Sequence, residues 1–251
     1  MIEEPINPVY VPYAALVRQQ LGVEPELWSF KSHPTYRGIL EHVSKDQGVD
    51  YMELIINKVK DKEKLSTLLD LFKKNDLYGK PLKEELPTVG YVSPTNARYL
   101  YHALLIADHY KTLNTKNIIE IGGGYGGLGL FLKSMLDCNY HIFDLPDVMK
   151  LQEKYLNLHN IECKFLDFNS KLPDDFFIVS NYCYSELRDN HILEQYKKII
   201  DMSDGGFMAW NALAQGGYVT IDETFKNKNV TINPENPLTG PGNLEIYWET
   251  P

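Results

Sequence analysis

A cluster of glycines within residues 122–129 constrains the fold of this chain more than any other feature of its sequence. The cluster follows the apolar run 117–121 without a spacer and leads into a stretch of helical spacing at about 126–136. Glycines at a turn from strand to helix let the backbone approach a ligand closely and leave the amides of the helix N-terminus facing it. The stretch therefore predicts a nucleotide-like ligand at the end of a parallel strand.

The glycines fit two templates. Gly122, Gly124 and Gly127 match the dinucleotide fingerprint G-x-G-x-x-G, and Glu120 with Gly122, Gly124 and Gly126 matches E-x-G-x-G-x-G. Glu120 favours the second template, because an acid on the strand suits a cationic ligand and would repel a pyrophosphate. S-adenosylmethionine carries a sulfonium and an ammonium group and no phosphate. NAD remains the alternative cofactor.

Two further acids follow predicted strands. Asp144 ends the next strand about twenty residues beyond the loop, where a carboxylate can accept hydrogen bonds from ribose hydroxyls. Asp167 ends the third strand, where it can accept the adenine amino group while Phe168 packs on the ring. The alternative interpretation of Asp167 is a helix cap or a surface acid.

Short apolar runs alternate with amphipathic stretches from residue 117 onward, as is typical of an α/β doubly wound, Rossmann-like sheet covered by helices. Ser93 as N-cap and Pro94 at the first position predict a preceding helix at about 94–112. The expected strands are 117–121, 140–143, 162–166, 176–180 and 206–210. The expected helices are about 126–136, 146–158 and 189–201. We expect a closing antiparallel pair of strands at 219–225 and 243–249.

Residues 1–92 differ from the rest of the chain, because their sequence pattern is typical of helices. Apolar residues recur at helical spacing in two sets, which are Met52, Ile55, Ile56 and Val59, and then Leu65, Leu68, Leu69 and Phe72. Prolines and glycines punctuate these segments, as expected of short helices joined by turns. The sequence therefore divides into a helical cap, 1–92, and a sheet domain, 93–251.

Composition excludes several classes of partner and compartment. A net charge of -9 has the wrong sign for a protein that binds nucleic acid through its phosphates. The three cysteines are odd in number and lack a C-x-x-C pair, so neither a disulfide framework nor a zinc site is indicated. No apolar run approaches the roughly 20 residues that span a bilayer, and the acidic, proline-rich start is unlike a signal peptide. We expect a cytoplasmic protein that does not bind membranes.

Four sequence segments carry a resemblance to a known family. They are Glu-Ile-Gly-Gly-Gly-Tyr-Gly-Gly (120–127), Phe-Asp-Leu-Pro-Asp-Val (143–148) with Leu-Gln-Glu-Lys-Tyr-Leu (151–156), and Ser-Asn-Tyr-Cys-Tyr-Ser-Glu-Leu (180–187). In these phrases the chain resembles class I S-adenosylmethionine-dependent methyltransferases, and more narrowly a family of sugar O-methyltransferases, over about residues 93–215. The resemblance implies a seven-stranded sheet, methyl transfer to a sugar hydroxyl, and a cap that builds the acceptor site and often a homodimer contact.

The glycine loop, the strand ends and the resemblance together nominate residues for each part of the site. The expected cofactor-binding residues are Glu120, Gly122, Gly123, Gly124, Tyr125, Asp144, Leu145, Asp167, Phe168 and Ser180. The expected acceptor-binding residues are Arg98, His102, Asn181, Tyr182, Ser185, Asn211 and Gln215. His102 has a competing interpretation, because packing against the sheet explains it equally well.

A sugar hydroxyl needs a base to take its proton while methyl transfer proceeds by in-line displacement. Glu186 directly follows the polar end of the fourth strand and is the favoured base, with His191 second. The competing interpretations are an acid favoured by a helix dipole for Glu186 and a surface histidine for His191. Some sugar O-methyltransferases use magnesium, but no dedicated acidic pair follows the fourth strand, so we expect metal-free catalysis.

Two other functions remain open from the sequence. A nicotinamide-dependent oxidoreductase would use the same glycines and Asp144, although no Tyr-x-x-x-Lys pair is evident. A methyltransferase-like subunit that binds ligand without catalysis is the second alternative.

Overall fold

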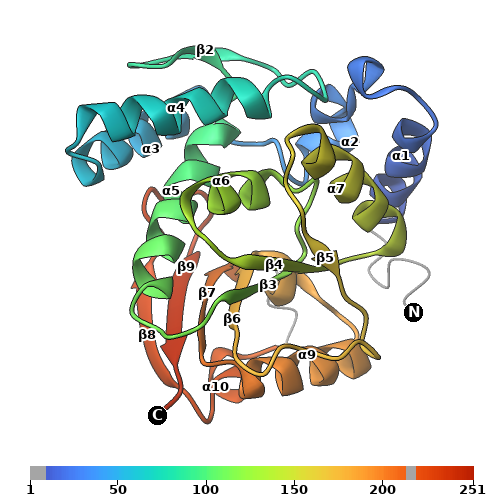
Figure 1. Ribbon diagram of the computed structural model, residues 1–251, viewed down its shortest axis with the longest axis vertical. Helices are drawn as coiled ribbons and strands as arrows, with labels where there is room; N and C mark the ends of the chain where they lie inside the picture. The colour runs from blue at the N-terminus through green and yellow to red at the C-terminus, as the bar shows by residue number, and fades with distance from the viewer. Residues whose placement is uncertain (1–9, 213–218) are drawn as a thin grey trace.

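A computed structural model describes residues 10–212 and 219–251. Within these residues seven strands form one mixed sheet in the order β5-β4-β3-β6-β7-β9-β8 (Figure 1). Its strands are β3 (Asn117–Ile121), β4 (Asn139–Phe143), β5 (Lys164–Phe165), β6 (Phe177–Asn181), β7 (Gly205–Trp210), β8 (Asn229–Pro234) and β9 (Leu244–Glu249). The first five are parallel, and β9 lies antiparallel between β7 and β8. The expected α/β Rossmann-like sheet of seven strands is confirmed.

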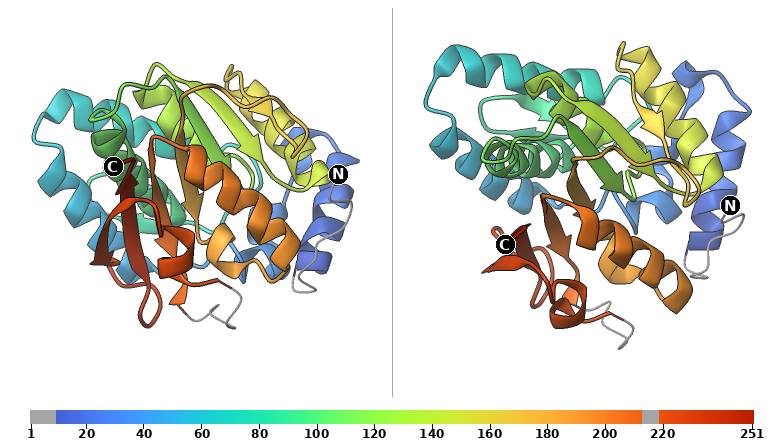
Figure 2. Two further views of the ribbon diagram at one scale, coloured as in Figure 1. Left: turned by 90° about the horizontal axis from the view of Figure 1, so that it is seen from below. Right: turned by 60° about the horizontal axis from the view of Figure 1, so that its bottom comes forward.

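Helices cover both faces of the sheet (Figure 2). One face carries α5 (Thr95–Tyr110), α6 (Gly127–Met135) and α7 (Pro146–Leu158), and the other carries α9 (Asn190–Met202) and the short α10 (Ile221–Thr224). The central strands are therefore buried on both sides, which explains the continuous apolar run in β3, where only Glu120 interrupts the isoleucines. The short helix α8 (Cys183–Glu186) directly follows β6.

The expectation for residues 219–225 is wrong. They contain α10 rather than a strand, and the antiparallel partner of β9 is β8. The side chain of Thr220 caps α10 by accepting a hydrogen bond from the Glu223 amide at 3.2 Å, and two acids occupy the first turn. The third strand is also shorter than expected, with only two residues at the edge of the sheet.

The N-terminal region is helical, as expected. It contains α1 (Val11–Leu21), 3-10 turns at Pro25–Leu27 and Phe30–Ser32, α2 (Pro34–Arg37), α3 (Lys45–Lys58), α4 (Lys62–Asn75) and a hairpin of β1 (Glu84–Leu86) with β2 (Gly90–Val92). Ser44 and Gln47 form a capping box at the start of α3. The predicted apolar faces turn inward, because Met52 and Ile55 of α3 and Phe72 of α4 are fully buried.

Helix α5 joins the helical region to the sheet. Almost all of its side chains are buried, and one continuous hydrophobic cluster includes Tyr51 of α3, Leu100 of α5 and Ile118 of β3. The region before residue 93 therefore shares a core with the sheet. Ser93 does not cap α5 through its side chain as expected; its hydroxyl instead donates to the Glu41 carboxylate at 3.0 Å.

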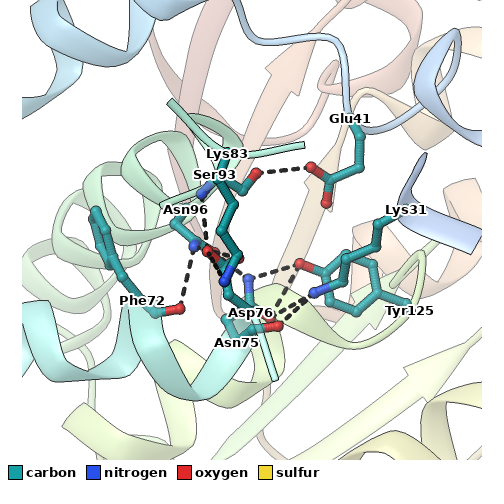
Figure 3. Close-up of polar contacts among 9 residues, drawn as sticks. All are labelled: Lys31, Glu41, Phe72, Asn75, Asp76, Lys83, Ser93, Asn96 and Tyr125. Carbon is teal, nitrogen blue, oxygen red and sulfur yellow. Dashed lines mark hydrogen bonds and ion pairs between the residues drawn. The ribbon is translucent and has the colours of Figure 1, made fainter. Parts of the chain in front are cut away.

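A buried polar network fastens the helical region to the glycine loop (Figure 3). Lys31 is only 1% exposed, and its Nζ donates to the Asn75 carbonyl at 2.5 Å while lying 4.1 Å from the ring centroid of Tyr125. Asn75 Nδ2 donates to the Tyr125 hydroxyl at 2.7 Å. Burial lowers the pKa of Lys31 to about 8.

The same network continues to the start of α5. Asp76 accepts hydrogen bonds from the Ser93 amide and from Asn96 Nδ2, each at 2.9 Å, and Lys83 Nζ lies 3.8 Å from its carboxylate. Asn75 also bonds to Asn96. The buried charges thus have hydrogen-bond partners, which is the condition under which burial of charge is tolerated.

Candidate functional site

A cavity of about 310 Å³ opens at the carboxyl ends of β4, β6 and β7. Ligands of open α/β sheets bind at this edge, in the crevice beyond the carboxyl ends of the strands. Helix α1 and the segment around Leu40 line it from the N-terminal region, and Asn243 lines it from the start of β9. The cavity brings together nine predicted site residues, which are Arg98, Gly122, Gly124, Asp144, Leu145, Asn181, Tyr182, Glu186 and Asn211.

The glycine loop needs its glycines for conformation and for space. Gly122, Gly124 and Gly126 have φ of +78°, +58° and +95°, in the left-handed region that other residues avoid. A Cβ on Gly122 would also lie 2.3 Å from the side chain of Cys183. The loop therefore follows a path at the cavity wall that a side chain would block.

Asp144 is held rigidly beside this loop. Its carboxylate accepts hydrogen bonds from the Leu145 amide at 2.8 Å and from Gln152 Nε2 at 2.7 Å, and Gln152 Nε2 also donates to the Gly124 carbonyl at 2.9 Å. Burial raises the pKa of Asp144 to about 6. Sequence reasoning missed Gln152, although it lies in the phrase 151–156 on the first turns of α7.

Glu120 lies beneath the glycine loop rather than at the cavity wall. It is 1% exposed and accepts the Tyr140 hydroxyl at 2.9 Å, and a Cβ on Gly123 would lie 2.9 Å from its carboxylate. Burial raises the pKa of Glu120 to about 7. Gly123 can therefore contact a ligand through its backbone, and Glu120 can act on a ligand through its charge.

Asp167 and Phe168 lie outside the cavity lining. Asp167 accepts hydrogen bonds from the Asn169 amide at 2.9 Å and from the Ser170 hydroxyl at 3.0 Å, so its carboxylate caps its own turn. These bonds lower its pKa. Phe168 stacks on Phe143 with centroids 5.6 Å apart, and Phe143 lines the cavity. Phe168 therefore contacts the cavity only indirectly, through its packing against Phe143.

Three other predicted residues make hydrogen bonds within the protein around the site. Tyr125 points away from the cavity into the network of Lys31 and Asn75, which corrects its expected contact with a cofactor. Ser180 donates to the Ile121 carbonyl at 3.0 Å. Ser185 donates to the Tyr182 carbonyl at 2.7 Å and accepts the Asn211 amide at 3.0 Å.

Glu186 lies in the cavity with both oxygens engaged. Oε1 accepts Asn211 Nδ2 at 2.9 Å, and Oε2 accepts the hydroxyl of Tyr10, which precedes α1. Burial, and then the charge of Glu186, raises the pKa of Tyr10. No sequence pattern indicates Tyr10, because its partner lies 176 residues away.

The two predicted histidines, His102 and His191, lie outside the cavity lining. His191 is exposed on α9, with Nε2 3.0 Å from Gln195 Nε2, and it does not line the cavity although its neighbours Asp189 and Ile192 do. His102 is fully buried, and its ring packs against Tyr182 and Phe207 of β7. Burial lowers the pKa of His102 to about 3, which agrees with the packing interpretation. Gln215 lies outside the described residues.

The strand order is the Rossmann order extended by an antiparallel hairpin. A family model described as lysine methyltransferase matches residues 91–194, from β2 to α9. The chain has the class I methyltransferase fold. The glycine loop after the first parallel strand lies at the cavity, as expected of a fold that binds S-adenosylmethionine.

Solved methyltransferases are distantly similar. The mitomycin 7-O-methyltransferase MmcR is 12% identical, with 98% of this chain and 69% of that chain covered and a TM-score of 0.44. The N-methyltransferase NodS of Bradyrhizobium japonicum is 12% identical, with 61% and 94% covered and a TM-score of 0.45. Phosphoethanolamine N-methyltransferase 2 of Haemonchus contortus, solved with S-adenosylmethionine, is 14% identical, with 54% and 39% covered and a TM-score of 0.43. No curated protein sequence matches the chain.

The described residues contain neither a candidate metal cluster nor a helix that could span a membrane. No three or more of their His, Cys, Asp and Glu side chains are grouped so that they could hold a metal ion. None of their helices is both long enough and apolar enough to cross a membrane.

Proposed function

We propose that the protein is an S-adenosylmethionine-dependent O-methyltransferase that acts on a hydroxyl group of a sugar, with Glu186 as the general base. The observation that carries this proposal is the hydrogen bond from the Tyr10 hydroxyl to Glu186 Oε2 inside the cavity. A hydroxyl donor in contact with a carboxylate is the arrangement that an alcohol acceptor needs to lose its proton. The acceptor hydroxyl would take the place of the Tyr10 hydroxyl.

The residues present fit the cofactor. Gly122 and Gly124 line the cavity with left-handed backbone, where a Cβ on Gly122 would collide with Cys183, and Asp144 offers a carboxylate to ribose hydroxyls. Glu120 adds a buried acid behind the loop, which suits a cationic ligand. When bound, the cofactor supplies an electrophilic methyl group.

The residues of this chain would perform the remaining tasks. Glu186 would accept the proton, and Asn211 Nδ2, 2.9 Å from Oε1, would keep the carboxylate oriented toward the acceptor. Asn181 offers a buried Oδ1 without a partner in the structure, which can accept a hydrogen bond from a second hydroxyl. Tyr182 lines the same cavity, and an aromatic ring can pack against the apolar face of a sugar.

The second candidate acceptor is a lysine side chain. The description of the matched family favours it, and an ammonium acceptor would need the same base before transfer. The two candidates differ in product, because one gives a methyl ether and the other a methylated amine. Mass spectrometry of products from matched panels of sugars and lysine peptides separates them, and methylation of lysine alone would overturn the sugar proposal.

The test of Glu186 is the Glu186→Gln variant. We expect kcat to fall by about 10²- to 10⁴-fold, the usual contribution of a general base, with unchanged affinity for S-adenosylhomocysteine. The matched control is Glu194→Gln, an exposed carboxylate on α9, which should keep full activity. Unchanged turnover in Glu186→Gln would refute the assignment of the base. Binding of NAD but not of S-adenosylhomocysteine would favour an oxidoreductase, and cofactor binding without turnover of any panel member would favour a binding subunit.

A further inference from the structure

We propose that the acceptor carries an oxyanion, a carboxylate or a phosphate, and that Arg98 binds it. This inference rests on the proposed function and names the substrate class of the same cavity. The acceptor would then be an acidic sugar rather than a neutral one.

Arg98 is a buried cation at the cavity. Its side chain lies in the first turn of α5, and the residue is 3% exposed. Nη2 donates to the Leu40 carbonyl at 2.8 Å, and Nη1 lies 3.2 Å from His42 Nε2. Among the described residues no carboxylate lies within 4.0 Å of the guanidinium. A guanidinium has five N–H donors, so these two contacts leave donors for a ligand.

The groups packed directly against Arg98 are uncharged, and among carboxylates only the charge of Glu41, more than 4.0 Å from the guanidinium within the described residues, raises the pKa of Arg98. Burial, and then the charge of Arg98, lowers the pKa of His42 to about 4, so the imidazole is neutral at pH 7. The guanidinium carbon lies 5.6 Å from the ring centroid of Tyr182, a contact that tolerates the cation without cancelling it. Glu41 accepts the Ser93 hydroxyl in the buried network.

The acids of the cavity are engaged elsewhere. Asp144 accepts hydrogen bonds from the Leu145 amide and from Gln152. Glu186 accepts hydrogen bonds from Tyr10 and Asn211. Asp189 caps α9 by accepting a hydrogen bond from the Ile192 amide at 2.9 Å. A buried charge without a counter-charge is costly, and a ligand that supplies the opposite charge removes that cost. Arginine is also the side chain whose geometry matches carboxylate and phosphate in a bidentate manner.

The position of Arg98 favours the acceptor over the ribose. Arg98 lies beside Tyr182, which follows β6, whereas Asp144 follows β4, and β3 runs between these strands. Two strand spacings separate the ends by about 10 Å. Thr239 and Asn243, from the segment before β9, line the same cavity and extend it farther from Asp144. The carboxylate of the cofactor has the same oxyanion chemistry, so the experiment must distinguish these two sources.

The experiment measures binding to the full chain saturated with S-adenosylhomocysteine. D-glucuronate, D-glucose 6-phosphate and D-glucose are titrated by calorimetry into the wild type, Arg98→Gln, Arg98→Lys and the control Arg37→Gln, an exposed arginine of α2. We expect at least one acidic sugar to bind about tenfold or more tightly than glucose, a preference that Arg98→Gln abolishes and Arg98→Lys keeps in part. Arg37→Gln should behave as the wild type.

Three results would overturn the inference. They are equal binding of acidic and neutral sugars by the wild type, no binding of either acidic sugar, or an Arg98→Gln variant that loses affinity for S-adenosylhomocysteine but keeps it for 5′-methylthioadenosine. The third result would place the carboxylate of the cofactor at Arg98. An Arg98→Gln variant that keeps the full preference for an acidic sugar would be a fourth such result, and Arg98→Lys tests the same point if Arg98→Gln does not fold. Failure of the wild type to bind S-adenosylhomocysteine would instead refute the proposed function.

Discussion

The pKa of Asp144 leads to a quantitative prediction about cofactor affinity. If the ionised carboxylate accepts the ribose hydroxyls, the affinity should follow the ionised fraction. With a pKa of about 6, this fraction is about 0.97 at pH 7.5 and about 0.09 at pH 5. The affinity for S-adenosylhomocysteine should therefore rise about tenfold from pH 5 to pH 7.5. Asp144→Asn should bind about 10- to 100-fold more weakly at pH 7.5, because a hydrogen bond to a charged group contributes about 1.5–3 kcal/mol.

Calorimetry at constant ionic strength between pH 5 and 7.5 measures both effects. The matched control is Asp147→Asn, three residues farther on, whose carboxylate pairs with Arg18 and Lys150 and does not line the cavity. Glu120, with a pKa of about 7, titrates in the same window, so Glu120→Gln isolates the part that belongs to Asp144. A wild-type affinity that is constant across this range, or full affinity in Asp144→Asn, would refute the reasoning.

The stability of the unliganded protein should show the opposite sign. The folded-state pKa of Asp144 lies above the value of about 3.9 expected in the unfolded chain. Its contribution to stability is therefore fully present below about pH 4 and is lost as the pH rises through about 6. Urea denaturation of wild type and Asp144→Asn across this range measures the difference.

Three further changes test other parts of the structure. Gly122→Ala should abolish binding of S-adenosylhomocysteine, because its Cβ would lie 2.3 Å from Cys183. Gly90 has a similar φ of +84° and nothing within 4 Å of the position that a Cβ would occupy, so Gly90→Ala should cost only about 1–2 kcal/mol of stability. Calorimetry and urea denaturation measure these two effects, and full binding by Gly122→Ala would contradict the first. Between pH 7.5 and 9 the free energy of unfolding of the wild type should rise by about 1 kcal/mol relative to that of Lys31→Met. The reason is that the pKa of Lys31 is lower in the folded protein, so the unfolded chain binds more protons than the folded protein in this range. Curves of unfolding free energy against pH that run parallel for the two proteins would contradict this prediction. Tyr10→Phe should leave kcat within about tenfold of the wild type, because the acceptor replaces that hydroxyl at the base, and a loss as large as that of Glu186→Gln would make Tyr10 itself essential.

The fold was predictable because its signals are local. The alternation of apolar runs and the glycine turn located β3, β4, β6 and β7 within a residue or two. The failure at 219–225 also has a local cause, because apolar Val219, Ile221 and Phe225 resemble a strand while Thr220 and Glu223 cap a helix. The spacing Thr-x-x-Glu was a signal that could have corrected the expectation.

The sequence predicts a site residue only where that residue directly follows a predicted strand. Asp144, Asn181 and Glu186 follow strands and line the cavity, but Tyr10 and Asn243 reach it from the two ends of the chain, and no sequence pattern indicates that approach. The direction of a side chain was also beyond the sequence. His191 precedes the buried Ile192 and Leu193, and about 100° of rotation per residue turns it to solvent.

The glycine loop separates two different environments with a single layer of backbone. Gly122 and Gly124 border the cavity, and Tyr125, the next residue, is bonded to Asn75 at the end of α4. Any displacement of this loop when a ligand enters must therefore be transmitted to the first helices through Asn75 and Lys31. Amide exchange along α4 thus offers a reporter of occupancy that lies outside the cavity lining and needs no label on the ligand.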